Sequence, residues 1–249
     1  TANEKNNGRT VTELPVNGDG VIKESEIGSS DLLIWQVANG ETGNIQSAPK
    51  NGANIFADCT SSGVDLLPNF NYQTALFDSR SWAGPAGVGI LVIKSSATWR
   101  NPLPHNDLNR TPNTYSLPLL LASAVALENY LSQTDIRSKL KNEIISFIKE
   151  QITDVDIASS TNGLGKFLSL SIKGVEADRL LLDLEDQGFA VESGSACKSA
   201  DMKPSHVLAA MGKPITGNIR LTIHKEITSE IVKDFCQALK TSVSKLRSN

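Results

Sequence analysis

The sequence predicts an open α/β sheet in the N-terminal half of the chain and a compact α+β unit in the C-terminal part, with a long helical region between them. Four short apolar runs each end in polar or glycine-rich residues, which is typical of buried strands that carry functional groups at their ends. Apolar residues then recur at spacings of three and four, which indicates helix, before strand and helix patterns alternate.

The composition excludes several classes of protein. Of the 249 residues, 39% are hydrophobic and 20% are charged, which is typical of a globular protein. The net charge of −3, with no basic run, argues against nucleic-acid binding. The apolar runs are too short to span a bilayer, so we expect no membrane association. Three cysteines without a CxxC pair and three scattered histidines predict neither a disulfide framework nor a metal site, and favour a reducing, cytoplasmic compartment.

The N-terminal segment begins with a predicted strand over residues 10–16, where apolar and polar residues alternate before an Asn-Gly-Asp-Gly turn. Short apolar runs bounded by polar residues then predict four buried strands. The strands cover residues 31–37, 54–57, 74–78 and 90–93. Their spacing leaves little room for helical connections and permits an antiparallel strand at the edge of the sheet.

Residues 95–115 show no periodicity and contain several prolines, which predicts a linker or long loop. Helical spacing then extends from Leu117 to about Gln151. We expect this helix to break at residues 132–135, whose Ser-Gln-Thr-Asp sequence suits the start of a second helix.

The C-terminal part combines alternating strand patterns with amphipathic helices. Strands are predicted at 167–172, 189–192 and 218–223, and helices at 177–187 and from Thr228 onward. Gly188 is placed to end the first of these helices.

A cysteine in a loop of small residues is the first candidate for chemistry. Residues 193–197 read Ser-Gly-Ser-Ala-Cys, and Lys198 and Lys203 follow. Small neighbours leave a thiol accessible, and cations favour the reactive thiolate. The alternative is that Cys197 is a small buried residue without reactivity. His206, on the helix that follows, is expected to be a packing or surface residue.

This loop, together with the Pro-Ser-His-Val-Leu-Ala-Ala-Met-Gly sequence of residues 204–212, resembles the cysteine loop of the cysteine desulfurases. These enzymes belong to the class V aminotransferase group, which depends on pyridoxal phosphate (PLP). The resemblance implies that Cys197 attacks the sulfur of a PLP-bound cysteine and holds it as a persulfide.

The resemblance extends to residues 56–63, Phe-Ala-Asp-Cys-Thr-Ser-Ser-Gly, which match the family's aspartate segment. It implies that Asp58 pairs with the protonated pyridine nitrogen of PLP. Ser61 takes the position of a glutamine that contacts the phenolic oxygen of the cofactor. On spacing alone, a helix N-cap or turn carboxylate is the favoured interpretation of Asp58.

The family's glycine-proline turn is matched by residues 84–89, Gly-Pro-Ala-Gly-Val-Gly. Three residues before this turn, the lysine that binds PLP as an imine is replaced by Ser81. The histidine before it is Arg80, and a phosphate-binding serine is Asp78. A serine cannot form an imine, and a carboxylate repels phosphate. Arg80 suits phosphate binding but equally a surface ion pair.

Two further positions are implied to bind substrate. Asn39 begins a segment, Asn-Gly-Glu-Thr-Gly, similar to the family's Asn-Asn-Glu-x-Gly, although Gly40 replaces the asparagine that contacts the cofactor ring. Arg220 falls where the family has the arginine that holds the substrate carboxylate, as a guanidinium can do with two hydrogen bonds. Its alternative is an arginine on the exposed face of a strand.

The resemblance implies the PLP-dependent transferase fold of the aspartate-aminotransferase type. It divides the chain into residues 1–113, part of the large cofactor-binding α/β domain; residues 114–152, a connecting helical region; and residues 153–249, the C-terminal α+β domain with the cysteine loop. The family's N-terminal third has no counterpart in this sequence, so the chain is expected to be a fragment or to have lost that part.

Two functions are compatible with these residues. The first is PLP-dependent removal of sulfur from L-cysteine, with Cys197 as acceptor, a sulfur-acceptor protein as partner, and a role in iron–sulfur cluster assembly. The second is a catalytically degenerate homologue that acts as scaffold, partner or sulfur-relay subunit. Both are expected to be homodimers, because the family's active site lies at a dimer interface.

Overall fold

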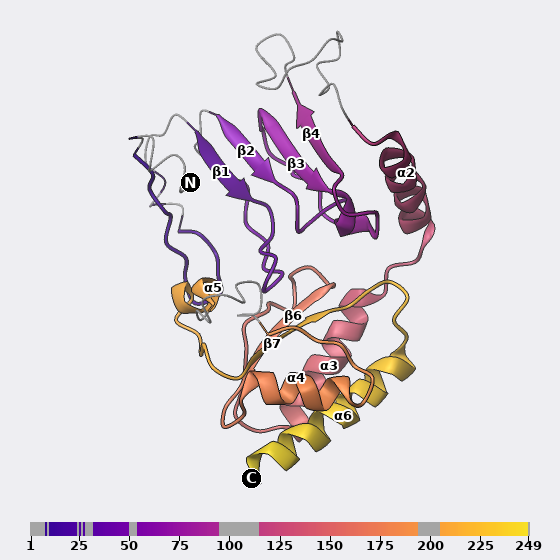
Figure 1. The fold of residues 1–249 in the computed structure, drawn as a ribbon. Helices are drawn as coiled ribbons and strands as arrows, with labels where there is room; N and C mark the ends of the chain where they lie inside the picture. The colour runs from indigo at the N-terminus through magenta and orange to yellow at the C-terminus, as the bar shows by residue number, and fades with distance from the viewer. Residues whose placement is uncertain are drawn as a thin grey trace.

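The computed structural model describes residues 10–23, 32–49, 54–94, 115–193 and 205–248, together with the single residues 8, 25 and 27. The linker predicted over 95–115 falls almost wholly outside these residues. Two sheets make up the framework, one formed by the N-terminal half of the chain and one by the C-terminal part (Figure 1).

The first sheet contains four strands in the order β1-β2-β3-β4, namely β1 (Leu33–Gln36), β2 (Ile55–Asp58), β3 (Thr74–Asp78) and β4 (Gly89–Ile93). The first three strands are parallel, and β4 pairs antiparallel with β3. All four predicted strands are therefore confirmed, and so is the antiparallel edge that the short connections permitted.

Alternation along these strands produces one well-covered face. Leu33, Trp35 and Ile55 pack together there, while the neighbouring Ile34 points to the other face and is 53% exposed. Strand β4 is exposed along nearly its whole length. The buried core residues of β1, β2 and β3 thus lie on one face of the sheet.

The short 3-10 helix η2 (Ser79–Trp82) directly follows β3. Asp78 accepts a hydrogen bond from the backbone N–H of Arg80 and so caps the helix. The buried Trp82 donates its indole N–H to Ser123 of the following long helix. These contacts hold the turn where the sequence places its candidate cofactor residues.

The long helical segment is two helices, α2 (Leu117–Ser132) and α3 (Arg137–Gln151), and the break lies where it was predicted. The Asp135 carboxylate accepts a hydrogen bond from the backbone N–H of Arg137 at the start of α3. Helix α2 lies beside β4 in Figure 1, and much of its apolar surface is exposed, including Leu121 and Val125. Within the part of the chain that the structure describes, a helix suited to crossing a membrane is absent.

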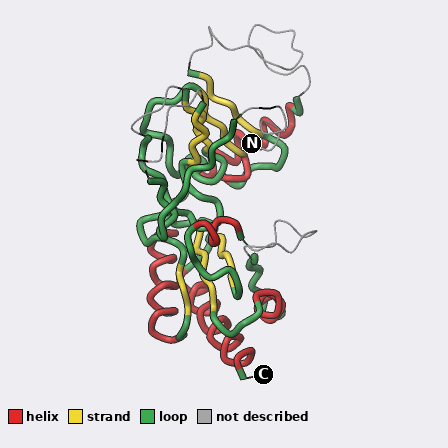
Figure 2. The backbone as a smooth tube through the Cα atoms, turned by 90° about the vertical axis from the view of Figure 1, so that its left-hand side faces the viewer, coloured by secondary structure: helices red, strands yellow, loops and turns green. Residues whose placement is uncertain are grey.

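The second sheet is antiparallel, in the order β5-β6-β7, with β5 (Val155–Ile157), β6 (Phe167–Ile172) and β7 (Asn218–Thr222). Helices α3, α4 (Ala177–Glu185) and α6 (Ser229–Arg247) build its core with it, and α5 (His206–Ala210) is a short helix apart from them. Figure 2 shows the two sheets stacked one above the other.

Two predicted strands are wrong. Residues 10–16 form only an isolated bridge, between Val16 and Ile22, and pair with no strand of the described part of the chain. Residues 189–192 form only a bridge at Glu192. The backbone N–H of Phe189 instead donates to Leu184 at the end of α4, where Gly188 adopts φ +87°, so this amide is not available to a sheet.

Strand β5 was not predicted, because three residues are too few to show an alternating pattern. It pairs with β6 and lies at the edge of the second sheet.

A buried cluster of charged and polar side chains joins the two parts of the chain. Asp65, from the loop after β2, accepts hydrogen bonds from Tyr130 of α2 at 2.7 Å and from Arg137 of α3 at 2.9 Å. The Lys166 ammonium, at the start of β6, lies 3.5 Å from the same carboxylate. Lys225 lies over the Tyr130 ring. We call these five side chains the interdomain cluster.

Asp65 is the acceptor on which this cluster depends, since it faces two buried cations. Burial and the neighbouring Asp65 carboxylate raise the pKa of Tyr130, so the phenol remains a hydrogen-bond donor. Burial lowers the pKa of Lys166, and the Asp65 charge partly opposes this effect. Asp65 is therefore the ion-pair partner of the buried Lys166, and it shares Arg137 with the more exposed Asp135.

We predict that Asp65→Ala lowers the free energy of unfolding by about 3 kcal/mol, because it leaves the buried Lys166 charge without the carboxylate that pairs with it and removes one of the two carboxylate partners of Arg137. Urea unfolding followed by circular dichroism measures this change. The control is Glu176→Ala, which removes an exposed pair with Arg179 and should change stability by at most about 0.5 kcal/mol. Equal effects of the two substitutions would contradict a special role for Asp65.

Candidate functional site

The predicted cofactor residues lie at the ends of three neighbouring strands. Asn39 follows β1, Asp58 is the last residue of β2, and Arg80 and Ser81 belong to η2 after β3. The carboxyl ends of parallel strands share one edge of a sheet, which is where ligands bind in open α/β folds. The topology therefore gathers residues that are distant in sequence.

Contacts among these loops show how tightly they are packed. A Cβ atom on Gly40 would lie 2.5 Å from Ser61 Oγ, and one on Gly63 would lie 2.3 Å from Ser81 Oγ. At Gly63, which adopts φ +55°, the Ser81 side chain leaves no space for a Cβ atom. At residue 40, where the resemblance implies an asparagine, a side chain would require the Ser61 hydroxyl to move.

Asp58 retains one carboxylate oxygen for a ligand. Its Oδ1 accepts hydrogen bonds from the backbone N–H and the hydroxyl of Thr60, at 2.9 and 2.6 Å. No hydrogen bond from a described residue reaches Oδ2. The residue is therefore a turn carboxylate, as its alternative interpretation proposed, and it still has an acceptor suited to a pyridinium N–H.

Ser81 and Arg80 are both engaged within their own turn. The Ser81 hydroxyl donates to the carbonyl oxygen of Asp78 at 2.7 Å. The Arg80 guanidinium forms an ion pair with the Asp78 carboxylate at 2.6 Å and is 70% exposed. The hydrogen bonds from Arg80 lower the pKa of Asp78, so this carboxylate remains charged. Any phosphate would meet Asp78 as well as Arg80.

These residues do not fit PLP held as an imine. Asp58 suits its pyridine nitrogen, but Ser81 has no amine, and the charge of Arg80 is already compensated by Asp78. Lys141 is a conceivable substitute amine, since burial lowers its pKa to about 8. Its ammonium donates to the carbonyl oxygens of Ser160 and Leu164 instead, and so serves the fold of the second part.

The two predicted substrate residues also have internal partners. The Asn39 side chain accepts hydrogen bonds from the backbone N–H groups of Glu41 and Thr42 and so shapes the turn after β1. Arg220, on β7, donates to the carbonyl oxygen of Gly40 at 3.2 Å and forms an ion pair with Glu192. The structure thus brings Arg220 of the second sheet to the loop after β1.

Sequence reasoning missed two acidic residues near Arg220. The sequence placed Glu192 in a predicted strand and Glu41 in the Asn-Gly-Glu-Thr-Gly segment, and neither residue was given a role in the site. Glu41 accepts a hydrogen bond from Ser205 at 2.8 Å across the gap between the two parts of the chain, and burial raises its pKa. A carboxylate next to a predicted carboxylate-binding arginine is visible only in the fold, because residues 192 and 220 are far apart in sequence.

Cys197, the predicted sulfur acceptor, lies outside the described residues. The other two cysteines, Cys59 and Cys236, are buried, and burial raises the pKa of each to about 11. Neither has the character of a reactive thiol. His206 is exposed on α5, as expected of a surface residue. The described residues contain no cluster of three or more side chains suited to a metal.

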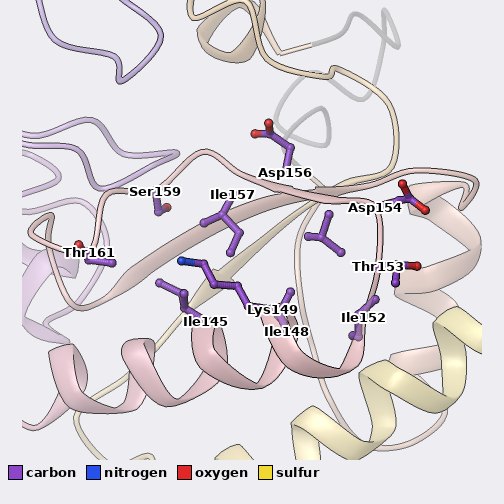
Figure 3. A pocket seen from close by; sticks show the side chains of 11 residues that line it. Ile145, Ile148, Lys149, Ile152, Thr153, Asp154, Asp156, Ile157, Ser159 and Thr161 are labelled. Atoms are coloured by element: carbon purple, nitrogen blue, oxygen red, sulfur yellow. The ribbon is translucent and has the colours of Figure 1, made fainter.

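A pocket of about 620 Å³ lies away from these residues, between α3 and β5. Figure 3 shows Ile145 and Ile148 of α3 facing Ile157 of β5 across it, with Lys149 reaching between them. It contains none of the predicted site residues, and so contributes nothing to the candidate site.

The chain is similar in sequence to known cysteine desulfurases, although no family model matches it. Cysteine desulfurase from Trichormus azollae is 28% identical over 96% of this chain and 66% of its own length. Cysteine desulfurase IscS from Clostridium botulinum is 28% identical over 96% of this chain and 67% of its length. The chain therefore spans about two thirds of the length of the curated relatives that it matches.

Solved structures confirm the predicted fold. A NifS-like protein superposes with a TM-score of 0.82 and 22% identity, covering 98% of this chain and 71% of its own. A cysteine desulfurase from Thermococcus onnurineus gives 0.80 and 17%, covering 97% and 68%. The chain has the PLP-dependent transferase fold, represented by part of its large α/β domain and by the α+β domain.

We predict that the protein with added PLP gives no borohydride-stable adduct at position 81, whereas Ser81→Lys gives one, because only the variant offers an amine there. Absorbance spectra and peptide mass analysis measure this. Arg80→Lys is the control, since it places an exposed lysine one residue away. An adduct on any lysine of the unaltered protein would instead show that an imine forms by another route.

Proposed function

This chain is a member of the cysteine desulfurase family, and from that premise we propose that it carries sulfur on the Cys197 thiol without a lysine-bound cofactor. It is a catalytically degenerate homologue in this proposal, and acts as a sulfur-relay subunit. PLP is the cofactor that the relationship implies, and Asp58 is the residue that suits it.

The observation that carries the proposal is Ser81. The residue at this position has a hydroxyl in place of an amine, and that hydroxyl donates a hydrogen bond to the Asp78 carbonyl oxygen. The neighbouring contacts support the same conclusion. The Ser61 hydroxyl lies close to Gly40, where the resemblance implies an asparagine, and Arg80 is paired with Asp78. PLP chemistry that depends on a lysine imine is therefore the less supported of the two functions.

The thiol reaction that remains needs no cofactor. The Cys197 thiolate attacks the terminal sulfur of a persulfide, the sulfur–sulfur bond of the donor breaks, and the donor leaves as a thiolate. A new sulfur–sulfur bond forms on Cys197, and no net oxidant is consumed. Lys198 and Lys203 supply positive charge nearby in sequence, which favours the thiolate.

The partners follow from the same chemistry. The donor is a protein or small-molecule persulfide, and the recipient is a sulfur-acceptor protein that attacks Cys197 in turn, as in supply of sulfur for iron–sulfur clusters. We propose a homodimer from the family resemblance, and a cytoplasmic location from the cysteine usage of the sequence. PLP-dependent desulfuration of L-cysteine is the competing function, and it requires the imine that Ser81 cannot form.

We predict that incubation with glutathione persulfide adds one sulfur atom to the peptide that contains Cys197, as measured by mass spectrometry after alkylation. Cys197→Ser should abolish the addition, while Cys236→Ser, which removes a buried thiol, should leave it unchanged. Sulfur found equally on all three cysteines, or on none, would contradict the relay function.

A second prediction concerns thiol reactivity against pH. At pH 8 iodoacetamide should alkylate Cys197 at least about tenfold faster than Cys59 or Cys236, because thiols with a pKa of about 11 contain little thiolate there. Labelling of the two buried cysteines should rise as the pH approaches 11. Equal, slow labelling of all three at pH 8 would argue that Cys197 is a buried, inert thiol.

A further inference from the structure

Arg220 is compensated by a carboxylate from its own chain. The Glu192 carboxylate forms a charge-assisted hydrogen bond with the Arg220 guanidinium. An arginine–carboxylate contact of this kind is the same interaction that an amino-acid ligand would make with its carboxylate. Glu192 therefore occupies the place of an external carboxylate at this guanidinium.

The backbone holds the two residues opposite each other. The backbone N–H of Glu192 donates to the Arg220 carbonyl at 3.1 Å, and that of Arg220 donates to the Glu192 carbonyl at 2.5 Å. They form an antiparallel bridge, in which directly opposed side chains lie on the same face. The ion pair thus follows from the backbone pairing and is not a chance meeting of two mobile surface side chains.

The rest of the guanidinium is also enclosed. One terminal nitrogen donates to the Gly40 carbonyl at 3.2 Å, and the Arg220 side chain is 20% exposed. Its Nε and the Glu41 Oε1 are both buried. Among the described residues, none accepts a hydrogen bond from this Nε and none donates one to this Oε1. The Arg220 charge also lowers the pKa of Glu41, against the larger effect of burial, which raises it.

We infer that Glu192 is a specificity-determining residue, an internal ligand that keeps free amino-acid carboxylates from Arg220. A ligand carboxylate has to displace Glu192 and approach against its charge, which disfavours anionic ligands. The inference rests on residues 192 and 220 and goes beyond the relay function, since it holds whether or not Cys197 carries sulfur.

The test compares L-cysteine with cysteamine, which has the same thiol and amine but no carboxylate, by isothermal titration calorimetry in reducing buffer. The unaltered protein should not prefer L-cysteine. Glu192→Gln removes the charge at nearly constant shape, and should tighten L-cysteine binding by about tenfold or more while leaving cysteamine unchanged. Adding Arg220→Gln to this variant should abolish the gain.

Three outcomes would overturn the inference. One is an Arg220-dependent preference for L-cysteine that is equally strong in the unaltered protein and in Glu192→Gln. Another is a failure of Glu192→Gln to bind L-cysteine more tightly. The third is a gain that survives Arg220→Gln. Glu192→Asp, which keeps the charge but shortens the side chain, provides a second variant, and thermal melts confirm that each variant is folded. None of these outcomes bears on sulfur addition to Cys197.

Discussion

The architecture depends on the Asp65 carboxylate and the cations around it. Asp65 comes from the loop after β2, Tyr130 and Arg137 from the two connecting helices, and Lys166 from the position just before β6. One carboxylate therefore contacts both parts of the chain and the helices between them. Buried charges tolerate little displacement from their partners, because each loses solvation that only the partner replaces. The contacts of Arg220 with Gly40 and of Ser205 with Glu41 cross the same junction, and so rely on this alignment.

Around the strand ends, the departures from the family pattern are consistent with one another. Ser61 lies against Gly40, and Ser81 lies against Gly63, so each small residue is matched to the one that it contacts. Such close contacts are typical of a densely packed protein interior.

The electrostatics show the same pattern. Two arginines were candidates for binding anionic groups: Arg80 for phosphate, from the chemistry of its guanidinium, and Arg220 for a carboxylate, from the family resemblance. Both pair with carboxylates of this chain, Asp78 and Glu192. An arginine with an internal partner offers less to an external anion, because the ligand must replace an existing ion pair. The positive charge expected at a PLP site is therefore largely compensated from within, which supports a role that does not use lysine-linked chemistry.

The sequence by itself determined the strands β1 to β4, the break between α2 and α3, and the family, because periodicity, caps and motifs are local features. It also identified Ser81 as the decisive position, since a missing amine needs no structure to be recognised. Only the tertiary structure decided that Phe189 leaves the sheet to end α4, that Asp65 meets Arg137 and Lys166, and that Glu192 lies opposite Arg220. Each of these pairings joins residues far apart in the chain or depends on competition for one backbone amide. Local sequence patterns predict which face of a strand or helix a side chain occupies, but only the tertiary structure determines which distant residue it contacts.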